Sequence, residues 1–141
     1  MSRVYFTDRN LGKQFPAILI AAGLNVERHH DLFSPQGSDE EWLEYCGTNS
    51  RFAITHDRRI RYKTNERDAV IRHRVAMLLL IGNAPFPELA RRFVATLEQI
   101  EAFLDKHKPP FIAKVYRPSP AMLELNPNAA GEISLWYPNK A

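Results

Sequence analysis

The sequence predicts a three-layer α/β domain with a mainly parallel central sheet. Strand-like runs alternate along the chain with helical patterns, which is the order that builds parallel sheets covered by helices. The length of 141 residues fits one domain and leaves no room for two cores of typical size. Hydrophobic residues make up 45% and charged residues 25%, so wholesale disorder, collagen repeats and coiled-coil rods are excluded.

The first half of the chain is expected to hold three strands, each a short run rich in β-branched, aromatic or apolar residues. They are Arg3–Thr7, Asn25–His29 and Arg51–Thr55. Apolar side chains recur at helical spacing from Lys13 to Ala22, between the first two strands. Gly23 suits the left-handed residue that follows a helix end, so a helix is expected there.

A second helix is expected before the third strand. Residues Asp31–Ser38 contain proline and glycine and are expected to form a loop. Ser38 and Glu41 are three residues apart, as in a capping box. We therefore expect a helix from Asp39 to about Cys46, ended by Gly47.

The second half of the chain continues the alternation. A helix is expected at Asn65–His73, a buried strand at Val75–Ile81 and another strand at Phe111–Tyr116. Apolar residues fall three to four apart from Phe86 to Leu104, which predicts one long helix. Prolines concentrate beyond this region, so the tail is expected to be loop-rich, with one edge strand near Leu135–Tyr137.

Acidic residues occur where the expected strands end. Asp8 and Asp57 directly follow the first and third strands, and Asp39, Glu40 and Glu41 open a helix. Because the carboxyl ends of parallel strands share one edge, where ligands bind, these acids should face the same crevice. Neighbouring strands lie about 4.8 Å apart, so two such carboxylates can share one ion.

A divalent cation is the expected companion of these acids. Packed carboxylates repel one another and raise each other's pKa. Oxygen ligands without cysteine or a convincing histidine pair favour Mg²⁺ or Mn²⁺ over zinc, and the single cysteine excludes a thiolate cluster. Such an ion supports hydrolysis of phosphodiester bonds, so the pattern favours a nuclease.

A basic run begins immediately after Asp57. Arg58, Arg59 and Arg61, together with Arg9, are expected to contact the phosphates of RNA. The alternative from charge order alone is a pair of solvated faces of opposite sign. Each aspartate taken singly also fits a turn or helix cap.

Three blocks of the sequence resemble the PIN-like ribonucleases, and more narrowly the VapC-type toxins. The blocks are Phe6–Gly12, Ser38–Leu43 and Ile54–Ile60, and the resemblance covers roughly residues 3–82. It implies a PIN-like fold, an Mg²⁺- or Mn²⁺-dependent endoribonuclease activity and, for toxin members, inhibition by a cognate antitoxin protein.

The resemblance also assigns roles to individual residues. Asp8 and Asp57 match the metal-binding, catalytic aspartates, and Thr55 matches the hydroxyl residue that supports them. The intermediate acid falls on Asp39–Glu41, where we favour Asp39 and Glu40 as catalytic metal ligands and Glu41 as a cap or supporting residue. A fourth acid is common in the family; here Glu66 or Asp68 is available, and either also fits a helix cap.

The expected organisation is a PIN-like nuclease domain over residues 1–116, with a proline-rich extension, 117–141, packed on it. No membrane span and no secretory signal are evident, so a cytoplasmic protein is expected. The expected partners are RNA, an antitoxin chain or a second copy of the protein. The apolar residues of the tail, Leu135–Tyr137, are a candidate contact surface.

Two other functions fit parts of the pattern. One is a catalytically silent PIN-fold module that binds RNA or an antitoxin. The other is a phosphoacceptor receiver domain, which also uses strand-end aspartates and a late lysine, for which Lys108 is available. Receiver domains have an adjacent acid pair after the first strand, whereas Asp8 is followed by Arg9 and Asn10.

Overall fold

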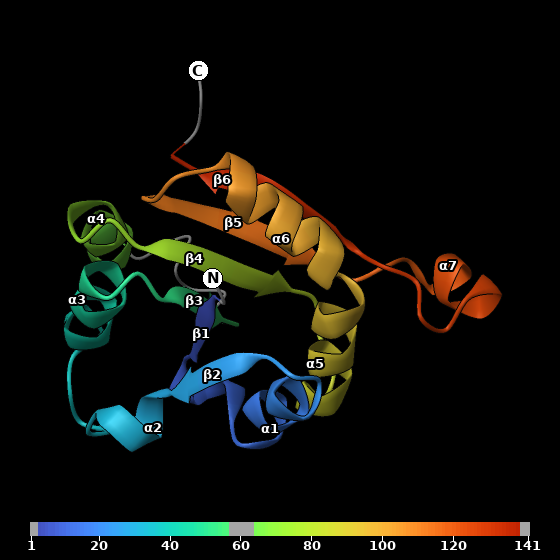
Figure 1. The fold of residues 1–141 in the computed structure, drawn as a ribbon, viewed down its shortest axis with the longest axis horizontal. Coiled ribbons are helices and arrows are strands. Elements are labelled where there is room, and N and C mark those ends of the chain that lie inside the picture. Colours follow the sequence, from blue (N-terminus) through green and yellow to red (C-terminus); the bar gives the residue numbers. More distant parts are fainter. Residues whose placement is uncertain (1–2, 57–63, 139–141) are drawn as a thin grey trace.

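The computed structural model describes residues 3–56 and 64–138 and has the α/β architecture predicted from the sequence. Its described strands form one six-stranded sheet in the order β2-β1-β3-β4-β5-β6 (Figure 1). The first five strands run parallel, and β6 pairs with β5 in the antiparallel direction. The strands are β1 (Val4–Thr7), β2 (Asn25–Arg28), β3 (Phe52–Thr55), β4 (Ala76–Ile81), β5 (Phe111–Tyr116) and β6 (Glu132–Tyr137).

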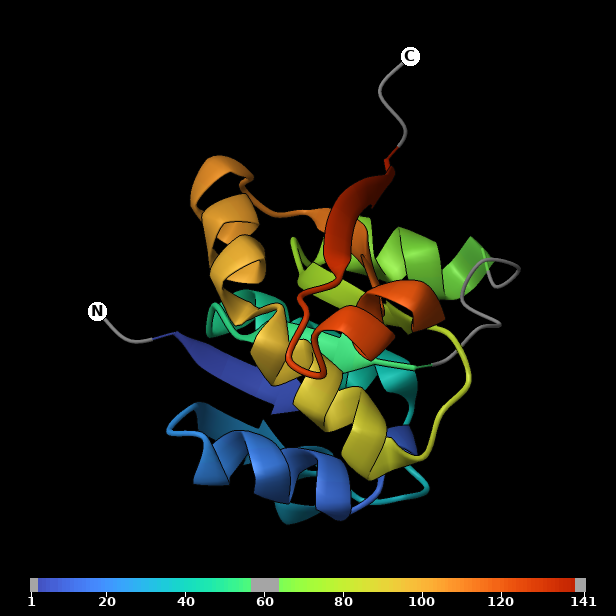
Figure 2. The same cartoon turned by 90° about the vertical axis from the view of Figure 1, so that its right-hand side faces the viewer.

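Helices cover both faces of the sheet, which makes three layers. In Figure 2, α1, α5 and α6 lie in front of the sheet, whereas α3 and α4 lie behind it. The helices are η1 (Arg9–Leu11), α1 (Gln14–Ala21), α2 (His29–Leu32), α3 (Asp39–Thr48), α4 (Thr64–Arg72), α5 (Phe86–Ala95), α6 (Leu97–Lys106) and α7 (Pro120–Leu125).

The central strand β4 shows why the sheet is buried on both sides. Its residues are apolar without interruption, and successive side chains point to opposite faces. Leu78 and Leu80 pack into the core beneath α1, α5 and α6. Met77 and Leu79 pack into the second core, beneath α3 and α4. A continuous apolar run is therefore the sequence signature of a strand covered on both faces.

The prediction of one long helix from Phe86 to Leu104 is wrong in one respect. The chain forms two helices there, α5 and α6, which are separated at Thr96. The buried Thr96 hydroxyl donates to the Arg92 carbonyl oxygen at 2.7 Å and accepts from the Gly131 backbone N–H at 2.9 Å. The side chain thus ties the helix junction to the C-terminal segment. Helical spacing of apolar residues continues across the junction, so the pattern alone does not reveal the bend.

Gly47 does not end α3, contrary to the sequence expectation, since the helix continues to Thr48. A Cβ atom at Gly47 would lie 1.7 Å from the carbonyl oxygen of His73. Glycine is needed there because α3 and the end of α4 approach closely, which no larger residue permits.

Two short helices lie in segments expected to be loops. The loop expected from Asp31 is helical at its start, in α2. The tail contains α7, which projects from the body of the molecule in Figure 1. The hydroxyl of Ser119 accepts from the Met122 backbone N–H at 3.2 Å and caps α7. Both helices are too short for a periodic apolar pattern to indicate them.

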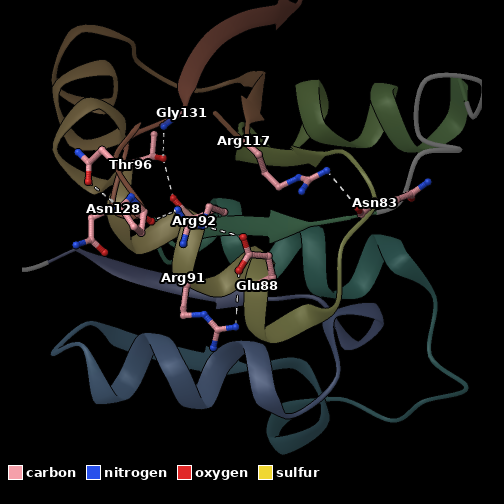
Figure 3. A network of polar contacts seen from close by, with 10 residues as sticks. Asn83, Glu88, Arg91, Arg92, Thr96, Arg117, Asn128 and Gly131 are labelled. Atoms are coloured by element: carbon pink, nitrogen blue, oxygen red, sulfur yellow. Dashed lines mark hydrogen bonds and ion pairs between the residues drawn. The ribbon is translucent and has the colours of Figure 1, made fainter. Parts of the chain in front are cut away.

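The C-terminal extension is built into the domain. Its strand β6 adds to the sheet, and Leu135 and Trp136 pack against the two cores. Figure 3 shows polar contacts within α5 and between the C-terminal extension and α5, its C-cap Thr96 or the segment before α5. Arg92 donates to the Pro127 carbonyl oxygen at 2.6 Å, and Arg117 donates to the Asn83 carbonyl oxygen at 3.1 Å.

Candidate active site

The candidate site lies at the carboxyl edge of the sheet, where β1, β2 and β3 end next to one another. The first and third strands are neighbours in the sheet, since Thr7 pairs with Ile54. The backbone N–H of Asp8 donates to the Ile54 carbonyl oxygen at 3.0 Å. This bond continues the β1–β3 pairing by one residue, and it holds Asp8 at the edge.

The carboxyl group of Asp8 is buried and oriented by a chain of hydrogen bonds. The residue is only 9% exposed. The Thr55 hydroxyl donates to Asp8 Oδ2 at 2.8 Å and itself accepts from Asn10 Nδ2 at 3.4 Å. Because the Asn10 amide occupies an acceptor position of the hydroxyl, the hydroxyl hydrogen is directed to Asp8. Thr55 therefore contacts the carboxyl group that it was expected to support.

The environment of Asp8 disfavours its charged form. Burial raises the pKa of Asp8 to about 6, and the nearby Asp39 carboxylate adds to the rise. The hydrogen bond from Thr55 and those from the backbone act in the opposite direction and leave the pKa raised. Two acids from distant parts of the sequence therefore influence one another here.

Asp39 is the first residue of α3, which places its carboxylate at the same end of the sheet. Its Oδ1 accepts from the indole Nε1 of Trp42 at 3.1 Å. The Trp42 ring is buried and stacks on Phe6 of β1, with centroids 5.4 Å apart. This stack joins the start of α3 to the strand that carries Asp8 and so fixes Asp39 relative to the edge.

The chain was also compared with protein-family models. The model described as a PIN like domain matches residues 3–82, more than half of the 141-residue chain. The chain belongs to the PIN-like domain family. The VapC branch of the resemblance is not separately supported by this match. Comparison with the curated proteins and with the solved structures found no match to the chain.

The other two acids at the start of α3, Glu40 and Glu41, have partners different from those of Asp39 in this PIN-like domain. The exposed Glu40 carboxylate accepts from Arg72 at 2.7 Å and lies 2.9 Å from the His73 ring Nε2. Hydrogen bonds from these two side chains lower the pKa of Glu40. Glu41 accepts from the Ser38 backbone N–H at 3.2 Å, as expected of a capping box. The structure thus brings Asp39, rather than Glu40 or Glu41, into electrostatic contact with Asp8.

Several predicted site residues lie outside the part of the chain that the structure describes. They are Asp57, Arg58, Arg59 and Arg61. Arg9 is described, and its guanidinium donates to the Pro35 carbonyl oxygen. Glu66 and Asp68 both lie on α4, with Glu66 in its first turn.

The residues present fit a hard divalent cation, although within residues 3–56 and 64–138 no three His, Cys, Asp or Glu side chains form a metal-binding cluster. Asp8 and Asp39 offer carboxylate oxygens, the ligands that Mg²⁺ and Mn²⁺ prefer. Asp8 is also buried beside another acid, an arrangement that a cation stabilises.

Sequence reasoning missed one part of this edge, a pocket of about 200 Å³ beside Asp8. It is lined by Thr7, Asp8, Arg9, Gly12, Lys13, Arg28, His29 and His30. His29 is buried, and its burial lowers the pKa of the ring. The rule that drew attention to Asp8 would have pointed to His30, which follows the expected strand Asn25–His29, but not to His29, because the strand ends one residue earlier, at Arg28.

None of the helices in the described ranges has the length and apolar character that a membrane span requires.

Proposed function

We propose that this PIN-like domain is an Mg²⁺- or Mn²⁺-dependent endoribonuclease that hydrolyses phosphodiester bonds of RNA. The observation that carries the proposal is the buried Asp8 carboxyl group, held at the carboxyl edge of the sheet with Asp39 close enough to raise its pKa. Two carboxylates held close together repel each other when both are ionised, and a divalent cation bound between them compensates this negative charge.

Asp8 and Asp39 are the described residues that would hold the ion, with Asp57 as the third ligand implied by the sequence. When bound, a divalent ion lowers the pKa of a coordinated water and stabilises the charge that develops on the scissile phosphate. Thr55 orients the Asp8 carboxylate, and Trp42 orients that of Asp39. We assign the intermediate acid to Asp39, since Glu40 is engaged by Arg72 and His73.

The toxin role is a narrower form of the same proposal. It rests on the resemblance of the three sequence blocks to VapC-type toxins, and it requires an antitoxin chain as partner. If the protein is such a toxin, its expression should arrest cell growth, and co-expression of the neighbouring open reading frame should relieve the arrest. Growth unaffected by expression of a cleavage-competent protein would exclude the toxin role and leave the nuclease proposal intact.

The nuclease proposal is tested by incubating the purified protein with a single-stranded RNA in Mn²⁺, in Mg²⁺ and in EDTA. We expect cleavage with either ion and none in EDTA. Asp8→Asn and Asp39→Asn should each lower the cleavage rate at least about 100-fold, because each removes a charged oxygen ligand.

The matched control is Asp105→Asn, which makes the same chemical change on α6, where Asp105 pairs with Arg3 at the surface. This variant should cleave at the rate of the unsubstituted protein. RNA binding without cleavage under any of these conditions would favour the silent binding module. Cleavage that survives both EDTA and Asp8→Asn would reject the proposed chemistry.

A further inference from the structure

We propose that the pocket beside Asp8, between the ends of β1 and β2, binds a phosphate group of the RNA chain. The inference rests on the proposed function, because it assigns the pocket to the same substrate. It adds a binding site on the side of Asp8 away from β3, built from residues that the sequence did not group together.

Three basic side chains line this pocket: Arg9, Lys13 and Arg28. Two are held in place by the fold. The Arg9 guanidinium donates to the Pro35 carbonyl oxygen, and Arg28 Nε lies 3.0 Å from Asp31 Oδ2. Their positions are therefore set before a ligand arrives, which lowers the ordering cost of binding an anion.

Lys13 differs from the two arginines. It is the residue immediately before α1. Its side chain is exposed, and within the described ranges no hydrogen bond or ion pair engages its amino group. Its amino group is therefore the basic group of the pocket that is left without a partner among the described residues.

One residue that lines the pocket, His29, carries an unpaired polar atom. His29 is 4% exposed, and its Nδ1 is buried with no hydrogen-bond partner in the described part of the chain. Aromatic rings surround it, with the Phe33 centroid at 5.6 Å and the Phe6 centroid at 6.3 Å. Buried polar groups are nearly always satisfied, so an unpaired nitrogen on a lining residue is an unusual feature of this pocket.

The balance of charge favours phosphate over a metal ion in this pocket. Arg9, Lys13 and Arg28 line the pocket together with one acid, Asp8. Asp31, which pairs with Arg28 and His30, offsets part of this positive charge, and the basic side chains remain in excess. A phosphate seated here would lie next to the carboxylates proposed to act on the scissile bond. The pocket would thus position the RNA chain by one of its phosphates.

Binding of RNA in EDTA tests the inference without cleavage. We would measure fluorescence anisotropy of a 3′-labelled single-stranded RNA, prepared with a 5′-phosphate or a 5′-hydroxyl, across a range of salt concentrations. Lys13→Gln should raise Kd about 3- to 10-fold and reduce the slope of log Kd against log salt by about 0.7, as expected for one lost phosphate contact. Lys13→Arg should restore most of the affinity.

The matched control is Lys106→Gln, which removes the same charge at the end of α6, before β5 and so at the opposite edge of the sheet. It should leave Kd and the salt slope unchanged. A Lys13 effect seen with both RNAs identifies an internal phosphate as the ligand, whereas an effect confined to the 5′-phosphorylated RNA identifies the terminal one.

Three outcomes would each overturn the inference. They are equal RNA affinities of Lys13→Gln and the unsubstituted protein, a loss of affinity in Lys106→Gln equal to that in Lys13→Gln, and no RNA binding at all. The nuclease proposal is judged separately, by cleavage in Mn²⁺. A protein that binds RNA through Lys13 and never cleaves it would retain the phosphate pocket and lose the proposed activity.

Discussion

Two carboxyl groups on neighbouring strands of this sheet have opposite surroundings. Glu27 of β2 pairs in register with Phe6, two residues before Asp8. Its carboxylate accepts from Arg51 Nε at 2.9 Å and from the Tyr45 hydroxyl at 2.8 Å, and the bond from Arg51 is the main cause of its lowered pKa. The Asp8 carboxyl group accepts a hydrogen bond from the Thr55 hydroxyl and lies near Asp39. Its pKa is raised, mainly by burial.

The difference separates an acid that stabilises the fold from the acid that we propose binds a cation. The fold itself supplies the counter-charge for Glu27, so that its ionised form stabilises the native state. For Asp8, no cation lies within ion-pair distance in the described part of the chain, so its ionised form destabilises the native state. Such unfavourable burial is typical of groups kept for binding or chemistry.

The largest expected effect on stability is that of Asp8→Asn. In EDTA at pH 7.5 the substitution should raise the free energy of unfolding by about 1–3 kcal/mol, because it removes a buried charge whose pKa is raised about two units. A carboxyl with a raised folded pKa weakens the native state as pH rises from its unfolded value of 3.8 toward about 6. The stability that Asp8→Asn gains over the unsubstituted protein should therefore vanish near pH 3.5. Urea denaturation at both pH values measures it, and a destabilised Asp8→Asn variant at pH 7.5 would contradict the comparison.

A divalent cation should reverse the penalty at Asp8. Mn²⁺ at ten times its Kd should raise the free energy of unfolding of the unsubstituted protein by about 1.4 kcal/mol. Asp8→Asn and Asp39→Asn should show little or none of this stabilisation, whereas Asp105→Asn should retain it. Thermal denaturation with and without Mn²⁺ measures the effect. Equal stabilisation of all four proteins would mean that the ion binds elsewhere.

The effect of Glu27→Gln on the free energy of unfolding should be opposite in sign to that of Asp8→Asn. Glu27→Gln removes a charged partner of Arg51 at a partly exposed site, so we expect a loss of about 1 kcal/mol at pH 7. Because the folded pKa of Glu27 is lowered, its contribution is present above the unfolded value of 4.5 and disappears as pH falls through the folded value. Urea denaturation from pH 7 to pH 3 should show the two stabilities converging. A pH-independent difference would assign the loss to packing.

The smallest effect is expected at Thr55. Thr55→Val removes the hydroxyl that stabilises the ionised Asp8, so the pKa of Asp8 should rise further. Thr55→Ser keeps the hydroxyl and should leave that pKa near its original value. Carbon-13 NMR of the Asp8 carboxyl across a pH titration compares the three proteins. In EDTA the stability at pH 7.5 should change by less than about 1 kcal/mol, and an unchanged Asp8 pKa in Thr55→Val would refute this role of the hydroxyl.

Asp8 was recognisable in the sequence because position along a strand is a local property. A β-branched, aromatic run that stops at Asp8 places the acid at the carboxyl end of a strand, and parallel strands share that edge. The supporting role proposed for Thr55 came from the resemblance to the PIN-like ribonucleases, because strand-end reasoning alone does not single out this hydroxyl. The capping role of Glu41 was also local, since it depends on a three-residue spacing from Ser38.

The partner of Glu40 was not recognisable in the same way. Asp39 and Glu40 are adjacent acids, and nothing local distinguishes them as ligands. The distinction arises because α3 packs against α4, and this packing brings Arg72 and His73 into contact with the Glu40 carboxylate. Both residues lie more than 30 positions further along the chain. The closeness of these helices depends on Gly47, a residue that sequence reasoning used as a helix end.

The sequence by itself determined the alternation of strands and helices, the burial of β4 and the placement of Asp8, because hydrophobic periodicity and strand ends are properties of short segments. Only the tertiary structure decided that β2 lies beside β1, which brings His29 and Arg28 around a pocket next to Asp8. It also decided that Thr96 divides the long helix, because the partner of that hydroxyl is Gly131. Both outcomes depend on contacts between segments distant in sequence, and such contacts form only when the burial of two apolar faces of the sheet brings those segments together.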